Sequence, residues 1–280
     1  MSNSVQAVKD KLKNVSREKN VDFNSVMRFY MYDRFVERLS KSKYKDNFIL
    51  KGGFYLSKLF GLDNRSTMDI DTAIRKAEFT EENIIKMINE IINIDVGDNV
   101  KFKIEKTETI RDEDEYGGLR ITINFMLENI KDKFHIDLAT GDPIYPRPDN
   151  YRYESLIGDE VYKVWSYNLE TVLAEKIETI LSKLETSSRM KDYYDIYLIY
   201  KFKFDKIDKE KFRGAVEKTF KKREFDADLI TNLNIVKESK VLKDKWISYS
   251  RKYSYARDVE FEETLKCLEQ FINIIVLVAV

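Results

Sequence analysis

The stretch "KGGFYLSKLFGLDNRSTMDIDTAI", residues 51–74, places two adjacent glycines ahead of an Asp-Ile-Asp sequence. The chain has only nine glycines in 280 residues, so a pair at Gly52 and Gly53 needs an explanation. The apolar run 48–50 before them predicts a short strand, and "FYLSKLFG" after them predicts a short helix closed by Gly61. Glycines at such a junction permit a tight turn and let a phosphate approach the helix start. An ordinary strand-to-helix turn would explain an isolated Gly-Gly equally well.

The Asp-Ile-Asp sequence lies in a run that alternates apolar and polar residues, "MDIDTAI", residues 68–74. This period of two predicts a strand, in which Asp69 and Asp71 project from the same face. Two close carboxylates repel each other when ionised, and a divalent cation between them removes that cost. A strand that faces solvent is the simpler explanation for the pair taken alone.

A third aspartate strengthens the interpretation as a metal site. In "KFHIDLA", residues 133–139, Asp137 and His135 share the face opposite the apolar side chains. If this strand neighbours the first, Asp137 joins Asp69 and Asp71 on one side of the sheet. Three carboxylates suit one or two Mg²⁺ ions, which prefer oxygen ligands and leave room for phosphates. We interpret His135 as a polar neighbour and not as a ligand.

Composition limits the classes of protein to consider. Lys+Arg and Asp+Glu are equal at 49 each, so only a local patch could attract a polyanion. The single cysteine, Cys267, excludes an internal disulfide and a cysteine-based zinc site, and indicates a reducing cytoplasm. The N-terminus lacks a secretory pattern, and the apolar C-terminus is too short to span a membrane. We expect the C-terminus to be the buried end of a last helix in a monomeric cytoplasmic protein without a membrane partner.

The hydrophobic periodicity changes along the chain. A helix is predicted after Thr80, followed by strands at 100–110, 119–127 and 133–139. From Asn168 onward every segment has helical spacing. We therefore expect an α/β (α+β) fold with a mixed sheet and flanking helices in residues 1–165, and an all-helical domain in residues 166–280.

Two charged groups stand out in the helical half. Lys176 lies inside the apolar stripe of "NLETVLAEKIETILSKL", residues 168–184, where an ammonium must either reach the surface or find a partner. Asp192 and Asp195 lie three residues apart and share one face of the next helix. A surface ion-pair face would also explain these aspartates.

Residues 201–252 contain 16 basic and 9 acidic residues, a local excess of seven. Such a segment could bind a phosphate backbone through charge alone, although a solvated helix face explains it equally well. Four aromatic residues at 246, 249, 253 and 255 could stack on unpaired bases, but packing in the core is the more common role at this spacing.

These motifs, in this order, resemble the AbiEii/AbiGii-type nucleotidyltransferase toxins of abortive-infection and type IV toxin–antitoxin systems, within the DNA polymerase beta-like superfamily. The resemblance covers about residues 45–225. It starts at Lys51 and the two glycines and continues through Arg65, Thr67 and the two aspartates. It then extends through "HIDLATGDPI", "LAEKIETIL", "SRMKDYYDIYLI" and "VEKTFKKRE". Many relatives have Ser or Thr after the glycines where this chain has Phe54, so a role for that hydroxyl is not carried over.

The resemblance implies a polymerase-beta-like fold and transfer of a nucleotide from an NTP with Mg²⁺. It implies that the acceptor is the 3′ end of tRNA, that transfer arrests growth in phage defence, and that a separately encoded antitoxin neutralises the protein. Whether the antitoxin binds directly stays open, as do transfer to a protein or antibiotic and NTP binding without catalysis. The implied catalytic residues are Asp69, Asp71, Asp137, Lys176 and Asp192, with the metal held by Asp69, Asp71 and Asp137. The implied nucleotide-binding residues are Gly52, Gly53, Arg65, Ser66, Thr67, Lys176 and Asp195.

Overall fold

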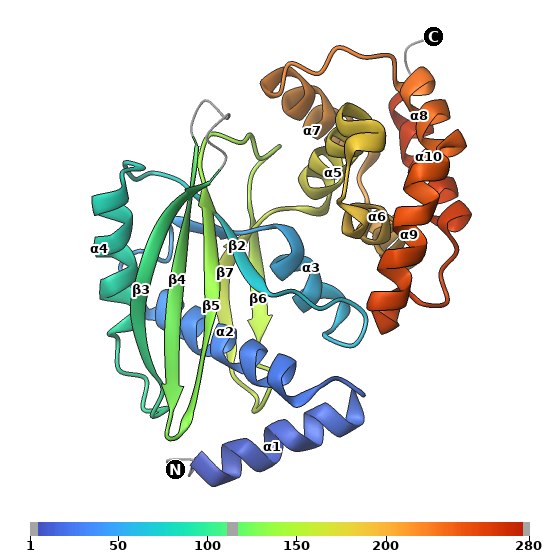
Figure 1. Cartoon of the computed structure of the whole chain (residues 1–280). Coiled ribbons are helices and arrows are strands. Elements are labelled where there is room, and N and C mark those ends of the chain that lie inside the picture. The colour runs from blue at the N-terminus through green and yellow to red at the C-terminus, as the bar shows by residue number, and fades with distance from the viewer. Residues whose placement is uncertain (1–4, 111–116, 277–280) are drawn as a thin grey trace. The chain divides into compact units, whose positions relative to one another are not determined.

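The computed structural model describes residues 5–110 and 117–276 (Figure 1). The chain divides into two compact units. The first comprises Met1–Gly141 with Asp149–Ser166, and the second Asp142–Pro148 with Tyr167–Val280. The proline-containing loop Asp142–Pro148 thus packs with the helical unit, although it precedes the expected boundary in the sequence. The predicted fold class, a mixed sheet with flanking helices followed by helices, is confirmed.

A seven-stranded sheet forms the centre of the first unit, in the order β3-β4-β5-β2-β1-β7-β6. The sheet is mixed because β2 pairs parallel with β5 and β1 pairs parallel with β7, whereas the other pairs are antiparallel. The strands are β1 (Phe48–Leu50), β2 (Asp69–Ile74), β3 (Lys101–Ile110), β4 (Gly118–Leu127), β5 (Ile130–Ala139), β6 (Asp149–Glu154) and β7 (Val161–Ser166).

The β6–β7 hairpin was not predicted. In β6 only Tyr153 is fully buried, with Tyr151 half-buried on the same face, so its alternation is short; the clearer alternation of β7 was overlooked. The other predicted strands are confirmed within a few residues; β2 and β5 each bury one face, whereas β1 is buried throughout and β3 is at most half-buried.

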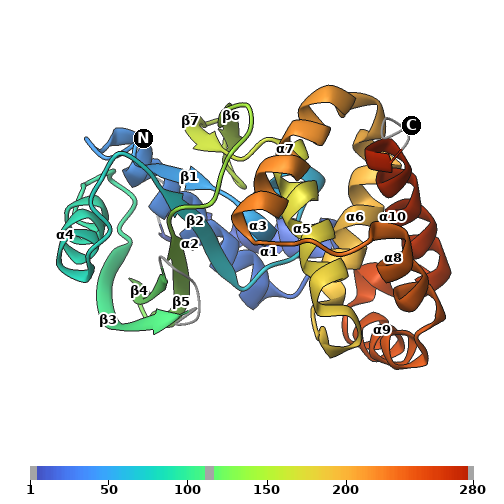
Figure 2. The same ribbon diagram turned by 90° about the horizontal axis from the view of Figure 1, so that it is seen from above.

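The helices of the first unit are α1 (Val5–Glu18), α2 (Phe23–Lys41), α3 (Gly52–Phe60) and α4 (Glu81–Ile92). The predicted start of α4 is confirmed, since the Thr80 hydroxyl accepts a hydrogen bond from the Asn83 N–H. In α2 every residue from 29 to 39 is buried. Its Tyr32 ring lies 5.2 Å from that of Phe134 on β5, and Figures 1 and 2 show α2 and α4 on one side of β3–β5.

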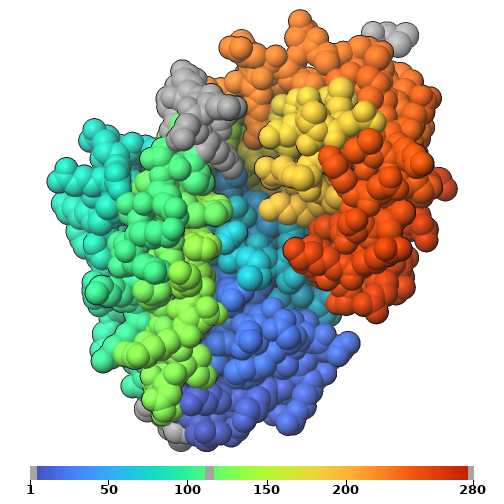
Figure 3. Space-filling view, viewed as in Figure 1, coloured from blue at the N-terminus to red at the C-terminus, as the bar shows by residue number. Residues whose placement is uncertain are grey.

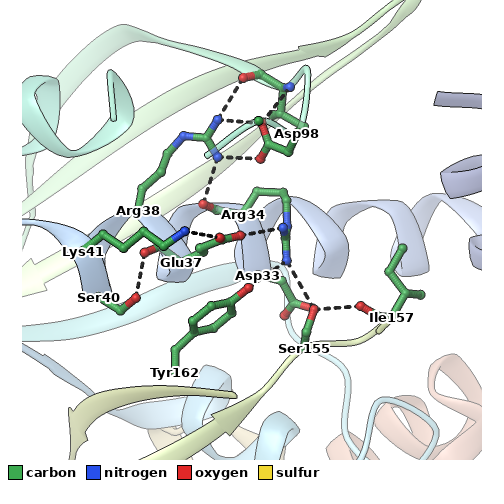
Figure 4. Close-up of polar contacts among 12 residues, drawn as sticks. Asp33, Arg34, Glu37, Arg38, Ser40, Lys41, Asp98, Ser155, Ile157 and Tyr162 are labelled. Carbon is green, nitrogen blue, oxygen red and sulfur yellow. Dashed lines mark hydrogen bonds and ion pairs between the residues drawn. The ribbon is translucent and has the colours of Figure 1, made fainter. Parts of the chain in front are cut away.

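Helix α2 also carries a buried polar network (Figure 4). Arg38 donates two hydrogen bonds to the Asp98 carboxylate, at 2.7 and 2.8 Å. Arg34 donates to Glu37 at 2.6 Å and to the Ser155 hydroxyl at 3.2 Å. Buried charges are tolerated only when they are paired. The network therefore joins α2 to the segment after α4 and to the β6–β7 hairpin.

The second unit is helical, as predicted from the change of period at Asn168. The Asn168 side chain caps the first helix by accepting from the Thr171 N–H at 2.8 Å. The last helix buries Phe271 and Ile272, while the apolar residues 277–280 lie outside the described residues. None of the helices in the described part of the chain is both long enough and apolar enough to cross a membrane. The helices are α5 (Leu169–Lys183), α6 (Met190–Lys203), α7 (Lys209–Lys222), α8 (Leu229–Glu238), α9 (Lys240–Lys252) and α10 (Phe261–Val276).

Candidate active site

The three aspartates predicted as metal ligands lie on two neighbouring strands. Strands β2 and β5 run parallel, and their register sets Asp71 opposite Asp137 and Asp69 opposite His135. Because side chains at positions two apart on a strand share a face, all three carboxylates project from the same side of the sheet. That side is opposite to the one on which Phe134 packs against α2.

The double glycine brings the start of α3 against this face. Gly52 has a φ of +59°, and a Cβ there would lie 2.5 Å from Asp71 Oδ2. A Cβ on Gly53 would lie 2.9 Å from Arg65 Nη2. The Gly53 N–H donates to Asp71 Oδ2 at 3.0 Å, and the Lys51 N–H donates to the Asp71 carbonyl at 3.0 Å. At Gly52 only glycine fits, because of both φ and the Asp71 contact, whereas a Cβ at Gly53 would require the end of the Arg65 side chain to shift.

The loop before β2 closes the other side of the junction. Arg65 is buried, with 3% of its surface exposed, and its Nη1 donates to the Ser66 carbonyl. The Thr67 hydroxyl donates to the Asp69 carbonyl at 3.3 Å, and a Cβ on Gly53 would lie 3.2 Å from that hydroxyl. Residues 65–67 thus pack between the start of α3 and the first aspartate. The structure brings all the predicted residues of the first unit together at this junction.

One residue of this site, Arg120 on β4, was missed by the sequence analysis. Its Nε and Nη2 each donate to an oxygen of the Asp137 carboxylate at 2.7 Å, and Nη2 lies 3.9 Å from Asp69 Oδ2. A signal for it existed. The short turn between β4 and β5 fixes an antiparallel register that sets Arg120 directly opposite Asp137.

The carboxylates influence one another's ionisation. Burial raises the pKa of Asp69 above its ordinary value, and repulsion by Asp137 and Asp71 raises it further, while the Arg120 guanidinium partly opposes both. Negative charge is therefore concentrated here and only partly neutralised by protein groups.

Whether these residues fit a metal ion depends on donor chemistry and on side-chain arrangement. Carboxylate oxygens from adjacent strands are the donors that Mg²⁺ prefers. In the described ranges, however, no group of three or more His, Cys, Asp or Glu side chains is arranged to hold a metal ion. The reason is local: Asp137 is held by Arg120, and Asp71 accepts from the Gly53 N–H. The donor set fits, and a metal bound by all three aspartates requires Asp137 to exchange Arg120 for the ion. His135 contacts the Thr122 hydroxyl at 3.0 Å, as a polar neighbour would.

The second unit holds the remaining predicted residues in one buried cluster. Lys176 on α5 is 7% exposed, and its Nζ lies 2.6 Å from Asp192 Oδ1 and 2.7 Å from Asp195 Oδ2, both on α6. Arg189 Nε donates to Asp192 Oδ2 at 2.8 Å. The ammonium is therefore paired in the interior of the unit and does not extend to the surface.

Mutual ion pairing keeps Lys176 and Asp192 charged although both are buried. Burial alone would raise the pKa of Asp192, but Lys176 and Arg189 outweigh it and lower the pKa to about 2. Burial likewise opposes the charge of Lys176, yet the two aspartates raise its pKa above the ordinary value. The lysine can thus keep a fixed positive charge inside the protein.

The basic segment 201–252 is less available to a partner than its composition indicates. Arg223 is mostly buried and pairs with Glu178, Glu175 and Asp142. Arg213 donates to the Ile274 carbonyl at 2.9 Å. Trp246 is 2% exposed, in agreement with the core role that was preferred for it.

Comparison with known proteins gave three matches. The model of a family described as nucleotidyl transferase AbiEii toxin, type IV toxin–antitoxin system, matches residues 34–267. A candidate nucleotidyltransferase from H. pylori has a similar structure, with a TM-score of 0.50 and 14% identity over 92% of this chain and 98% of that chain. The protein JHP933 from Helicobacter pylori has a TM-score of 0.50 and 13% identity over 91% and 94%. At such identities these structures show the fold. Among curated proteins, none matches the sequence significantly.

Proposed function

Because this chain belongs to the AbiEii nucleotidyltransferase toxin family, we propose that it transfers a nucleotide from an NTP, with Mg²⁺, to a hydroxyl acceptor. One observation carries the proposal. Asp69, Asp71 and Asp137 share one face of the sheet, directly beside the glycine-lined start of α3. Carboxylates for a cation and a helix start for phosphates are the two parts that nucleotidyl transfer requires.

In this proposal the three aspartates hold Mg²⁺, which when bound neutralises charge on the phosphates. Gly52 and Gly53 leave the start of α3 open to the triphosphate, and the adjacent Arg65–Thr67 loop lines the same junction. The acceptor hydroxyl oxygen forms a bond to the α-phosphorus, and the bond from that phosphorus to the bridging oxygen breaks, so that pyrophosphate leaves. An oxygen of Asp137, once released by Arg120, takes the proton of the hydroxyl.

Within the helical unit, Lys176 is proposed to offset the charge that develops on the pyrophosphate. Its ammonium is held by Asp192 at 2.6 Å and Asp195 at 2.7 Å, so the proposed role requires its third N–H to reach the pyrophosphate. Asp192 would orient the ammonium, and Asp195 would support it. Lys176→Met is expected to lower kcat much more than it raises KM for the NTP, because this charge acts mainly on the leaving group.

The acceptor that we propose is the 3′ end of tRNA, and the expected consequence is growth arrest in phage defence. The support is the toxin family, whose type IV systems include a separate antitoxin. We therefore also propose that a separately encoded antitoxin neutralises this chain in the cytoplasm.

The test is incubation of the purified protein with Mg²⁺, each α-phosphate-radiolabelled NTP in turn, and total bacterial tRNA. Asp69→Ala is run beside it, with Asp132→Ala as the matched control. Asp132 lies on β5 like Asp137 but is an exposed partner of Arg28. Label on tRNA that is lost in Asp69→Ala and kept in Asp132→Ala supports the proposal. Label on protein or on an antibiotic would change the acceptor, and transfer by Asp69→Ala would overturn the assigned roles.

A further inference from the structure

The face of the sheet that carries the three aspartates extends well beyond them. Along β5, residues at every second position follow Asp137 on the same side, first His135, then Lys133 and Lys131. The strand register continues this side across the sheet, with Lys133 beside Asn124 and Lys131 beside Met126 on β4. Six residues of strand place Lys131 about 20 Å from Asp137.

These two sets of cross-strand neighbours on β5 and β4 continue onto the edge strand β3, where each set ends in a lysine. Asn124 pairs with Lys103, and Met126 pairs with Lys101. We call the set Lys101, Lys103, Lys131 and Lys133 the lysine face. All four lysines are exposed. In the described part of the chain, only Lys133 among them forms an ion pair, with Glu105 at 3.3 Å. Since the net charge of the protein is zero, this positive charge is a local concentration.

The lysine face is hollowed and uncovered within its unit. A hollow of about 670 Å³ is lined by the four lysines with Asn124 and Met126, and also by Phe102, Phe125 and the acidic Asp132 at the intervening strand positions. Helices α2 and α4 lie on the other side of β3–β5, and no helix described in the first unit lies over this side (Figures 1 and 2). Figure 3 shows the green surface of these strands turned to the viewer. The half-buried Met126 and the lysine stems give the hollow an apolar floor beneath charged rims.

We infer that the lysine face binds the phosphate backbone of the acceptor RNA and leads its 3′ end along β5 to Asp137. The inference rests on the proposed nucleotidyl transfer and names the path of its acceptor. The charge is complementary to a phosphate backbone, which is bound by lysines without regard to sequence. The lysine face is continuous with the three aspartates, which favours RNA over an acidic protein. An RNA strand that lies along this face would have its 3′ end at the carboxylates.

The test measures binding of a short fluorescent single-stranded RNA by anisotropy over a series of salt concentrations, without NTP. The variant is Lys103→Gln/Lys131→Gln, which removes two charges and no ion pair. The matched control is Lys45→Gln/Lys86→Gln, two exposed lysines of the same unit that are not on this face. Each lost contact to single-stranded nucleic acid lowers the slope of log K against log salt by about 0.7, so the first variant is expected to lose about 1.4. The control is expected to keep the wild-type slope.

Three outcomes would overturn the inference: a slope that is unchanged in Lys103→Gln/Lys131→Gln, no binding of RNA by the wild type, or displacement of the RNA by polyglutamate at an equal concentration of charge. Transfer to tRNA is measured separately with Asp69→Ala. If nucleotide is transferred to tRNA but the salt slope is unchanged in Lys103→Gln/Lys131→Gln, only the RNA-binding role of the lysine face is refuted. A reduced slope without transfer keeps RNA binding and refutes the proposed function.

Discussion

Asp71 connects the parts of the candidate active site at the scale of single residues. Its carboxylate accepts from the Gly53 N–H and its carbonyl accepts from the Lys51 N–H, so both its side chain and its backbone contact the start of α3. This contact is close enough that the identity of Gly52 is fixed by the position of Asp71 as well as by its own φ.

Gly52→Ala is expected to destabilise the protein more than Gly97→Ala. Both glycines have positive φ, +59° and +70°, where a residue other than glycine costs about 1–3 kcal/mol. A Cβ at Gly52 also meets Asp71 Oδ2 at 2.5 Å, whereas nothing lies within 4 Å of a Cβ at Gly97. Urea denaturation of the two variants measures the difference. Equal losses would mean that the Asp71 carboxylate simply moves aside.

Lys176→Met is expected to lower the free energy of unfolding by about 3–5 kcal/mol, because it leaves buried carboxylates without their partner. The carboxylates are those of Asp192 and Asp195, both fully buried. The triple variant Lys176→Met/Asp192→Asn/Asp195→Asn is expected to recover most of this loss. Chemical denaturation measures both variants, and a triple variant no more stable than the single one would contradict the explanation.

The stability that Asp192 contributes is expected to depend on pH. Its pKa of about 2 in the folded protein lies below the ordinary 3.8, so the contribution is full above pH 3.8 and is lost as the pH falls through about 2. The shift corresponds to about 2 kcal/mol. The advantage of the wild type over Asp192→Asn, measured by denaturation at several pH values, should therefore shrink between pH 4 and 2. An advantage that stays constant would contradict the assignment.

At the scale of elements, the antiparallel pairing of β4 with β5 places the Arg120 guanidinium against Asp137, where the proposed metal ion would bind. Arg120→Gln is expected to tighten the binding of Mn²⁺ to the protein without NTP, because the group that holds Asp137 is weakened. The number of free Mn²⁺ ions is read from the electron paramagnetic resonance signal during titration. Thr122→Ser serves as the control on the same strand. Weaker binding in Arg120→Gln would instead make Arg120 a positioning residue for Asp137.

Some of the correctly predicted elements have a hydrophobic periodicity that reflects burial of one face. Strand β2 and helix α4 are examples, each bounded by a local signal such as the Thr80 cap. Contacts between elements were harder to predict. Arg120 was overlooked because its role comes from a cross-strand partner, and the burial of Lys176 became clear only when α6 was seen to supply both aspartates. The roles of these residues in transfer stay predictions.

At the scale of the whole molecule, equal numbers of acidic and basic residues are distributed unevenly, as the lysine face and the aspartates beside it show. With a sequence pI of about 6.7, light scattering at low salt is expected to peak near that pH and to fall as salt screens attraction between unlike patches. In Lys103→Gln/Lys131→Gln, which has two fewer positive charges, the peak should move to lower pH. A scattering peak that changes neither with salt nor in the variant would indicate that the association is apolar.

The tight junction at Gly52 also has a genetic consequence. Every amino acid other than glycine carries a Cβ, so every missense change in this codon sets an atom against Asp71. When the antitoxin of such a family is lost, cells that carry an inactive copy of the toxin are selected. In such a selection, codon 52 is expected to yield inactivating changes of every kind, whereas codon 97 should yield few. Deep sequencing of surviving clones would count the substitutions at each codon and thereby test whether the backbone conformation at Gly52 tolerates any other residue.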